Sequence, residues 1–291
     1  MIMLKKIIFT FIVYHLFSTI AYSDAWLQKK NKGLFITTIA TQQFNSLSAN
    51  GTYNHNNKVY QNLLLLYSEY GLTNRLTLGA KVIALDSFLL NGKSMFKNSV
   101  KDRTFGLDTA DLFLRIGIIR NHKYVVLSLV TLFSFPSIEH NRPKISYFSL
   151  KKYAYEARLE FGLKFNKSNY ATITTGYHRY INNWYDEARL EMLYCHYFLE
   201  NLYMMARFQK IFYIITNKNT AARGYNALNN SVFDFFSKTG FAKFTLSFAT
   251  TITKHTALEF GFYATVKSKL LRTSQLDLDL YGIFTSFWYQ F

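Results

Sequence analysis

The sequence predicts an all-β protein, a transmembrane antiparallel β-barrel of about 12 strands. Among its 291 residues are 28 Phe and 22 Tyr, which favour strands, and only 2 Pro. The chain is 49% hydrophobic and 18% charged, so apolar residues must alternate with polar ones. It lacks the several apolar runs of about 20 residues that a multi-span helical membrane protein needs, and it is too apolar for disorder. Short connections between these runs alternate with connections that are mostly longer, as in transmembrane barrels.

The first 23 residues have the features of a secretory signal peptide. Lys5 and Lys6 form a positive start, an apolar stretch follows from Ile7 to Ile20, and Ala21-Tyr22-Ser23 resembles a cleavage site. An uncleaved anchor is the alternative, but a stretch of about 14 residues is short for a membrane span. We therefore predict cleavage before position 24, with 1–23 as signal peptide and 24–291 as the barrel domain.

Twelve runs with period-two hydrophobicity predict the strands in order. They lie near 33–45, 59–71, 75–87, 107–119, 123–135, 153–165, 170–180, 188–198, 202–212, 237–251, 257–267 and 276–291. The clearest is Tyr155 to Phe165, where Tyr, Ala, Leu, Phe, Leu and Phe alternate with Glu, Arg, Glu, Gly and Lys. Each apolar face is long enough to cross a membrane as a tilted strand of about 9 to 11 residues.

The connections predict which way the barrel runs. Short ones fall at 71–74, 120–122, 166–169, 199–201 and 253–256. Short periplasmic turns and long external loops are typical of transmembrane barrels, so both termini should lie in the periplasm. Pro136 and Pro143 fall in one predicted external loop, where no ladder hydrogen bond is lost.

The last strand favours a barrel over a soluble sandwich, which would hide its apolar faces against a second sheet. Odd positions from Tyr281 to Phe291 form one apolar face that ends at the terminal Phe. An exposed terminal edge of this kind would invite aggregation in a soluble protein. The chain thus resembles Gram-negative outer-membrane β-barrel proteins. This resemblance implies an assembly signal at Tyr281, Phe287, Tyr289 and Phe291, read by the barrel-assembly machinery, and surrounding outer-membrane lipid.

Two short phrases resemble another group of barrels. Tyr70 to Gly79 and Thr256 to Gly261 are similar to the strand–turn–strand phrases of transporter-like barrels related to the meta-pathway phenol transport family. The similarity implies architecture and gives no reason to infer a phenolic substrate.

The polar faces of the predicted strands place seven bases and five acids in the lumen. These pore-lining candidates are Lys81, Asp111, Arg115, Glu156, Arg158, Glu160, Lys164, Arg189, Glu191, Arg207, Lys243 and Glu259. They predict either a constriction that selects solutes by charge or a paired network that plugs a small barrel. We expect passive passage of small polar solutes.

A second hypothesis is a plugged barrel whose basic external loops bind lipid or a surface partner. Those loops carry Lys93, Lys97, Lys101, Arg103, Arg142, Lys144, Lys151, Lys152, Lys218, Arg223, Lys267, Lys269 and Arg272. Nucleic acid is not an expected partner for an exported chain, despite its formal net charge of +17.

A third hypothesis is an outer-membrane hydrolase that uses His178 with Ser134 or Ser146. No nucleophile-elbow motif, phosphate loop, GxGxxG or HExxH phrase supports an enzyme. The single Cys195 allows no intramolecular disulfide, and the spacings of a zinc site are missing. We therefore expect a barrel that is not an enzyme and holds neither metal nor cofactor.

Overall fold

The computed structural model describes residues 27–47, 53–91, 99–120, 122–136, 153–166, 168–181, 185–199, 201–215, 241–265 and 281–291. Within these ranges the regular structure is entirely β. No helix among them is long and apolar enough to span a membrane. The predicted signal peptide and most of the basic loop residues lie outside the described ranges.

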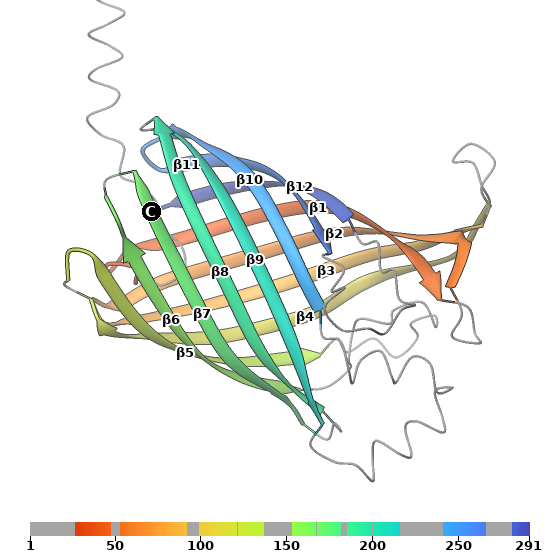
Figure 1. Ribbon diagram of the computed structural model, residues 1–291, viewed down its shortest axis with the longest axis horizontal. Helices are drawn as coiled ribbons and strands as arrows, with labels where there is room; N and C mark the ends of the chain where they lie inside the picture. The colour runs from red at the N-terminus through yellow and green to blue at the C-terminus, as the bar shows by residue number, and fades with distance from the viewer. Residues whose placement is uncertain are drawn as a thin grey trace, which may run out of the picture.

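Twelve antiparallel strands form one closed barrel, in which each strand pairs with its neighbours in sequence and β1 pairs with β12 (Figure 1). The strands are β1 Gly33–Leu47, β2 Tyr53–Thr73, β3 Leu76–Asn91, β4 Ser99–Ile119, β5 Val125–Pro136, β6 Ala154–Lys164, β7 Asn169–Tyr180, β8 Tyr185–Leu199, β9 Leu202–Ile215, β10 Phe241–Thr253, β11 Thr256–Thr265 and β12 Tyr281–Gln290. The predicted fold and strand number are confirmed.

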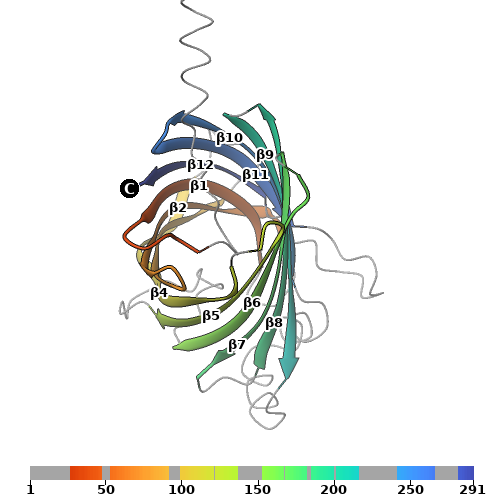
Figure 2. The ribbon, with the colours of Figure 1, turned by 90° about the vertical axis from the view of Figure 1, so that its left-hand side faces the viewer.

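The connections divide the barrel into two ends. The five short connections, β2–β3, β4–β5, β6–β7, β8–β9 and β10–β11, lie at one end, which we call the turn end. The start of β1 and the terminal Phe291 lie at the same end. Figure 2 views the barrel from this side and shows the strands curving around a ring. We call the opposite end, where most of the connections are longer, the loop end.

Several strands are longer than their patterns predict, and β2 and β4 exceed their predicted ranges by the most. β2 begins at Tyr53 and β4 at Ser99, which places Lys101 and Arg103 in a strand and not in the expected loop. β2 also continues through Thr73, so its turn to β3 is tighter than predicted. At the loop end, β1 to β4 extend beyond the described ends of β5 and β12 (Figure 1).

The start of β1 and the C-terminal residue close the barrel through backbone hydrogen bonds. The amide of Gly33 donates to the carbonyl of Phe291 at 3.0 Å, and the amide of Phe291 donates to the carbonyl of Gly33 at 3.0 Å. A Cβ on Gly33 would collide with the ring of Phe291. The absence of a side chain at position 33 therefore lets the last aromatic ring lie over the first residue of β1.

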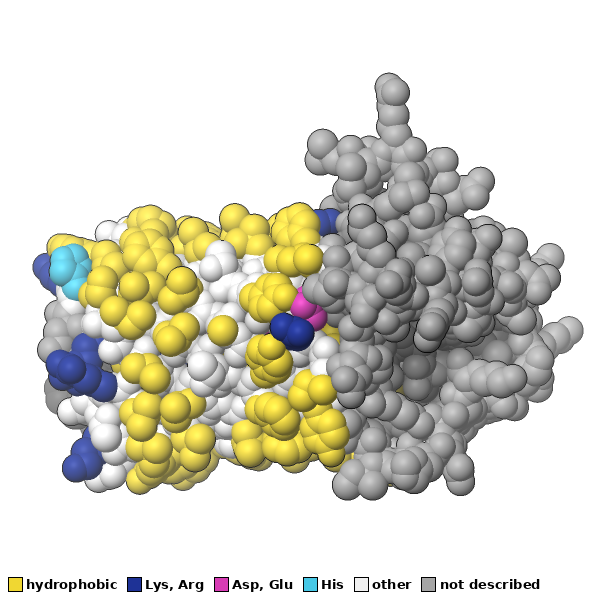
Figure 3. All heavy atoms as spheres, turned by 90° about the horizontal axis from the view of Figure 1, so that it is seen from below, with side chains coloured by type: hydrophobic (Ala, Val, Ile, Leu, Met, Phe, Trp, Pro, Cys, Tyr) yellow, Lys and Arg dark blue, Asp and Glu magenta, His cyan; other side chains and the backbone are white. Residues whose placement is uncertain are grey.

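The outer wall carries the apolar face of each strand. On β12, Tyr281, Ile283, Phe287 and Tyr289 are exposed, while Gly282, Ser286 and Trp288 between them are buried. Hydrophobic side chains cover much of the wall in Figure 3, and Lys and Arg side chains gather at the turn end. This arrangement fits a lipid-facing surface bordered by charged residues.

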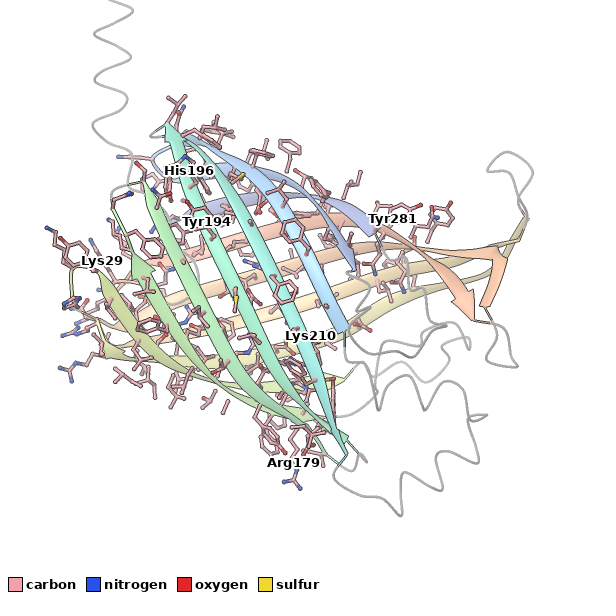
Figure 4. The ribbon with its side chains drawn as sticks, viewed as in Figure 1. Lys29, Arg179, Tyr194, His196, Lys210 and Tyr281 are labelled. Carbon is pink, nitrogen blue, oxygen red and sulfur yellow. The ribbon has the colours of Figure 1, made fainter. Side chains whose placement is uncertain are left out.

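Several polar groups of the outer wall lie toward its edges (Figure 4). Near the turn end, Tyr194 Oη and His196 Nδ1 each lie 2.7 Å from Asn169 Oδ1. Arg179 lies near the loop end of β7, and Lys210 Nζ stands 5.6 Å from the ring centroid of Phe212 on β9. Aromatic rings with polar ends suit the boundary between lipid tails and water.

Apolar side chains cluster inside the barrel toward the turn end. One buried cluster comes from β1 and from β7 to β12, and comprises Leu34, Tyr170, Leu193, Cys195, Tyr197, Tyr203, Met205, Ala249, Ala257 and Trp288. A second, formed by Phe113, Val130 and Leu132, lies on β4 and β5. Tyr67 of β2 packs against both, so its ring links apolar surfaces from two sides of the lumen.

Candidate functional site in the barrel lumen

The lumen is the candidate site because the charged side chains of the strands gather there. The twelve residues predicted to line it all lie on the strand face opposite the exposed apolar one. They belong to β3, β4, β6, β8, β9, β10 and β11. The barrel joins most of them into three clusters, which the linear sequence does not show.

The first cluster is built on Arg115 of β4. Its Nη1 donates to Glu69 Oε1 at 2.5 Å, and its Nε donates to Glu160 Oε2 at 2.9 Å. Ser128 donates to the same oxygen of Glu160 at 3.2 Å, and Tyr67 donates to Glu69. The guanidinium thus links β2 to β6, which lie two strands away from β4 on either side, and buried charges of both signs are paired.

The second cluster is built on the buried carboxylate of Glu156 on β6. Arg158 Nη2 donates to it at 3.0 Å and Arg189 Nη1 at 2.7 Å. His178 Nδ1 lies 2.8 Å from Glu156 Oε2. Arg189 also donates to Glu187 Oε2, at 2.8 Å through Nε and 2.5 Å through Nη2. Three neighbouring strands, β6, β7 and β8, therefore share one ionic network.

The third cluster follows on β8 to β11. Arg207 Nε lies 3.1 Å from Glu191 Oε1, and Gln209 donates to Glu191 Oε2 at 2.5 Å. Next to it, Lys243 Nζ lies 3.8 Å from the ring centroid of Tyr263. Cation–π contact of this kind stabilises an ammonium group inside a protein.

The remaining predicted residues occupy separate places. Lys81 and Asp111, opposite one another on β3 and β4, form an ion pair at 2.5 Å. Glu259 on β11 is buried and accepts a hydrogen bond from Trp288 Nε1 at 3.1 Å. Lys164 is the last residue of β6, at the turn end. With these residues, the polar inner surface includes charged side chains from β3, β4, β6 and β11 as well.

The sequence interpretation missed two acids of this network, Glu69 and Glu187. Glu69 follows the run Leu63 to Leu66, in which both faces of β2 are apolar, so alternation gives no inward side. Glu187 precedes the predicted start of its strand, whereas β8 begins at Tyr185. Adding Glu69 and Glu187 to the five predicted acids gives seven acids, as many as the seven predicted bases. Equal numbers of acids and bases therefore replace the predicted excess of bases.

The basic and acidic side chains of the lumen nevertheless differ in how exposed they are. Four bases have side chains between 27% and 36% exposed, namely Lys81, Arg158, Arg189 and Arg207. Of the acids that they pair with, Asp111, Glu156 and Glu187 are at most 6% exposed and Glu191 is 25% exposed. The lumen thus presents positive groups to solvent and holds most of their counter-charges in the wall.

Residues 27–32, which we call the N-terminal strap, lie against the inside of the turn end. The amide of Gln28 donates to Thr77 Oγ1 at 3.2 Å, and its side chain donates to Glu69 at 3.0 Å. Asn31 donates its amide to the Gly71 carbonyl at 2.9 Å. A Cβ on Gly71 would collide with the strap backbone, and one on Gly117 would collide with Leu27. Two glycines therefore make room for the strap.

The predicted hydrolase residues do not form a dyad. His178 is bonded to Glu156, and no hydrogen bond joins it to Ser134, while Ser146 lies outside the described residues. The Nε2 atom of His178 is buried without a hydrogen-bond partner. Within the described ranges, no group of three or more His, Cys, Asp or Glu side chains is arranged to hold a metal ion.

Comparisons with known proteins identify the architecture. No protein-family model and no curated protein matches the chain. Among solved structures, the COG4313 outer membrane channel from Pseudomonas putida F1 superposes with a TM-score of 0.67 at 10% identity, covering 94% of this chain and 100% of that one. The NanC porin gives 0.51 at 8% identity, with 88% and 98% covered. The KdgM porin in complex with disordered oligogalacturonate gives 0.50 at 6% identity, with 89% and 99% covered. The chain therefore has the fold of outer-membrane β-barrel channels.

Proposed function

We propose that the protein is an outer-membrane channel through which small polar solutes pass passively, down their gradient. The observation that carries this proposal is the inward surface of the barrel, where ion pairs expose their bases and bury most of their acids. Charged lumen walls select solutes in channels of this architecture. The porins and channel with the same fold support the proposal, which contains no covalent chemistry and no cofactor.

The proposal includes a route to the membrane. After signal cleavage near Ser23, the chain would cross the periplasm and reach the barrel-assembly machinery through Tyr281, Phe287, Tyr289 and Phe291. The exposed apolar face of β12 supports contact with outer-membrane lipid. A signal-peptide deletion should abolish outer-membrane recovery, and mass analysis of the mature chain should find its first residue at position 24.

A plugged barrel is the second candidate, and one observation favours it. Tyr67 packs against both buried apolar clusters, and the N-terminal strap adds Gln28 to the lumen on the same side. Such a barrel would act through its loops, on lipid or a surface partner. The two candidates differ in whether water and ions cross the turn end.

Single-channel conductance of the refolded mature protein tests the choice. Heat-modifiable gel mobility first establishes that the barrel is folded. Discrete conductance steps are the expected result, because exposed charges line the route. A heat-modifiable barrel that conducts no ions contradicts the channel and supports the plugged barrel. Hydrolysis of phospholipid or peptide by folded protein, lost on His178→Ala, would contradict both.

A further inference from the structure

We propose that Arg158 and Arg189 form a binding site for the carboxylate of a small anionic solute. The two guanidiniums stand on either side of Gly176, since Arg158 on β6 pairs with Gly176 on β7, and Gly176 pairs with Arg189 on β8. This site rests on the proposed function in one respect, which is that the solute reaches the lumen.

The two guanidiniums are fixed in place before any solute arrives. Glu156, whose side chain is 0% exposed, accepts hydrogen bonds from both guanidiniums. Glu187 accepts a further hydrogen bond from Arg189. A Cβ on Gly176 would lie 2.9 Å from Arg158 Cγ and 3.0 Å from Glu156 Oε1, so a larger residue there would crowd the Arg158–Glu156 pair. Preorganised side chains bind a ligand with a smaller loss of conformational freedom.

Donor groups remain available on the exposed side. A guanidinium has five N–H groups. The hydrogen bonds between described residues use two on Arg158, through Nε and Nη2, and three on Arg189, through Nε, Nη1 and Nη2. Three donors on Arg158 and two on Arg189 are then free to bind a solute. Both side chains are 27% exposed.

The available donors indicate an oxyanion as ligand. The two acids of the network are at most 6% exposed, so a cation would meet guanidinium before carboxylate. Planar guanidiniums match the two oxygens of a carboxylate through paired N–H donors.

Equilibrium binding to folded protein in detergent tests the site without requiring conductance. Calorimetric titration with glucuronate and with glucose, which differ in one carboxylate, should give binding of glucuronate alone. Arg158→Gln or Arg189→Gln should weaken it about 10- to 100-fold, the effect of losing hydrogen bonds to a charged group. Arg207→Gln, which removes an exposed guanidinium of another cluster, is the matched control and should leave the affinity unchanged.

The outcomes separate the site from the channel. Binding in a barrel that conducts no ions supports the site and overturns the proposed function. Conductance without glucuronate binding overturns the site alone. Equal losses in all three variants overturn it as well, because they indicate a general positive field. Arg158→Lys keeps the positive charge but lacks the planar guanidinium. Its heat-modifiable gel mobility shows whether the variant is folded, so that a loss of binding is not mistaken for unfolding. A glucuronate affinity between those of the parent and Arg158→Gln supports a paired guanidinium–carboxylate contact, whereas the full parental affinity contradicts it.

Discussion

Replacing Arg115 with methionine should destabilise the barrel by about 3–5 kcal/mol, because two buried carboxylates lose their partner. The Arg115 side chain is 4% exposed, and those of Glu69 and Glu160 are 1% and 7% exposed. At about 4 Å between charges and an effective dielectric constant of about 20, each pair contributes about 4 kcal/mol of attraction. Desolvation of the guanidinium costs several kcal/mol and offsets part of the total of ~8 kcal/mol.

Urea-induced unfolding in lipid vesicles, followed by tryptophan fluorescence, measures this change. Arg207→Met is the matched control, because Arg207 and Glu191 are 36% and 25% exposed and such a pair contributes about 0–1 kcal/mol. Adding Glu69→Gln and Glu160→Gln to Arg115→Met should recover most of the loss, since no unpaired charge then remains. If Arg115→Met and Arg207→Met unfold at the same urea concentration, the reasoning is refuted.

Three further predictions concern the turn end. Cys195, which is 0% exposed, should react with a maleimide only after unfolding, and rapid labelling of folded protein would contradict the packed cluster. Tyr67→Ala should raise single-channel conductance, whereas Tyr194→Ala on the outer wall should not; equal conductance in parent and Tyr67→Ala would show that this ring does not narrow the passage. Gly71→Val should displace the N-terminal strap and speed tryptic cleavage after Lys29, measured by mass spectrometry; an unchanged rate would mean that the strap needs no room at Gly71.

The strand pattern could be predicted where only one face of a strand is apolar. Tyr155 to Phe165 alternates along its whole length, and β6 occupies Ala154–Lys164. The start of β2 could not be predicted, because Asn54 to Lys58 is polar on both faces. Pairing with β1 and β3 extends the strand there, with Asn54 opposite Ser46 and Lys58 opposite Leu90. Backbone hydrogen bonds to neighbours, which sequence periodicity does not record, set this length.

The inward residues could be predicted, but their partners could not. Period-two alternation places Arg115 on the polar face of its strand, whatever lies beside it. Its two acids come from β2 and β6, each two strands away in the barrel. Such contacts depend on barrel curvature and on long side chains, and both arise only when the sheet has closed. For the same reason, sequence periodicity does not predict that the basic side chains are more exposed than the acidic ones.

The seam between β1 and β12 also bears on how the barrel is completed. Gly33 and Phe291 exchange two backbone hydrogen bonds, and ten further residue pairs, from Leu34–Gln290 to Gln43–Tyr281, continue the ladder. A factor that binds the last strand by adding a strand to this edge would occupy the backbone groups that β1 needs. Release of the newly made chain and closure of the ring would then be one strand exchange, in which β1 is the competitor that displaces the factor.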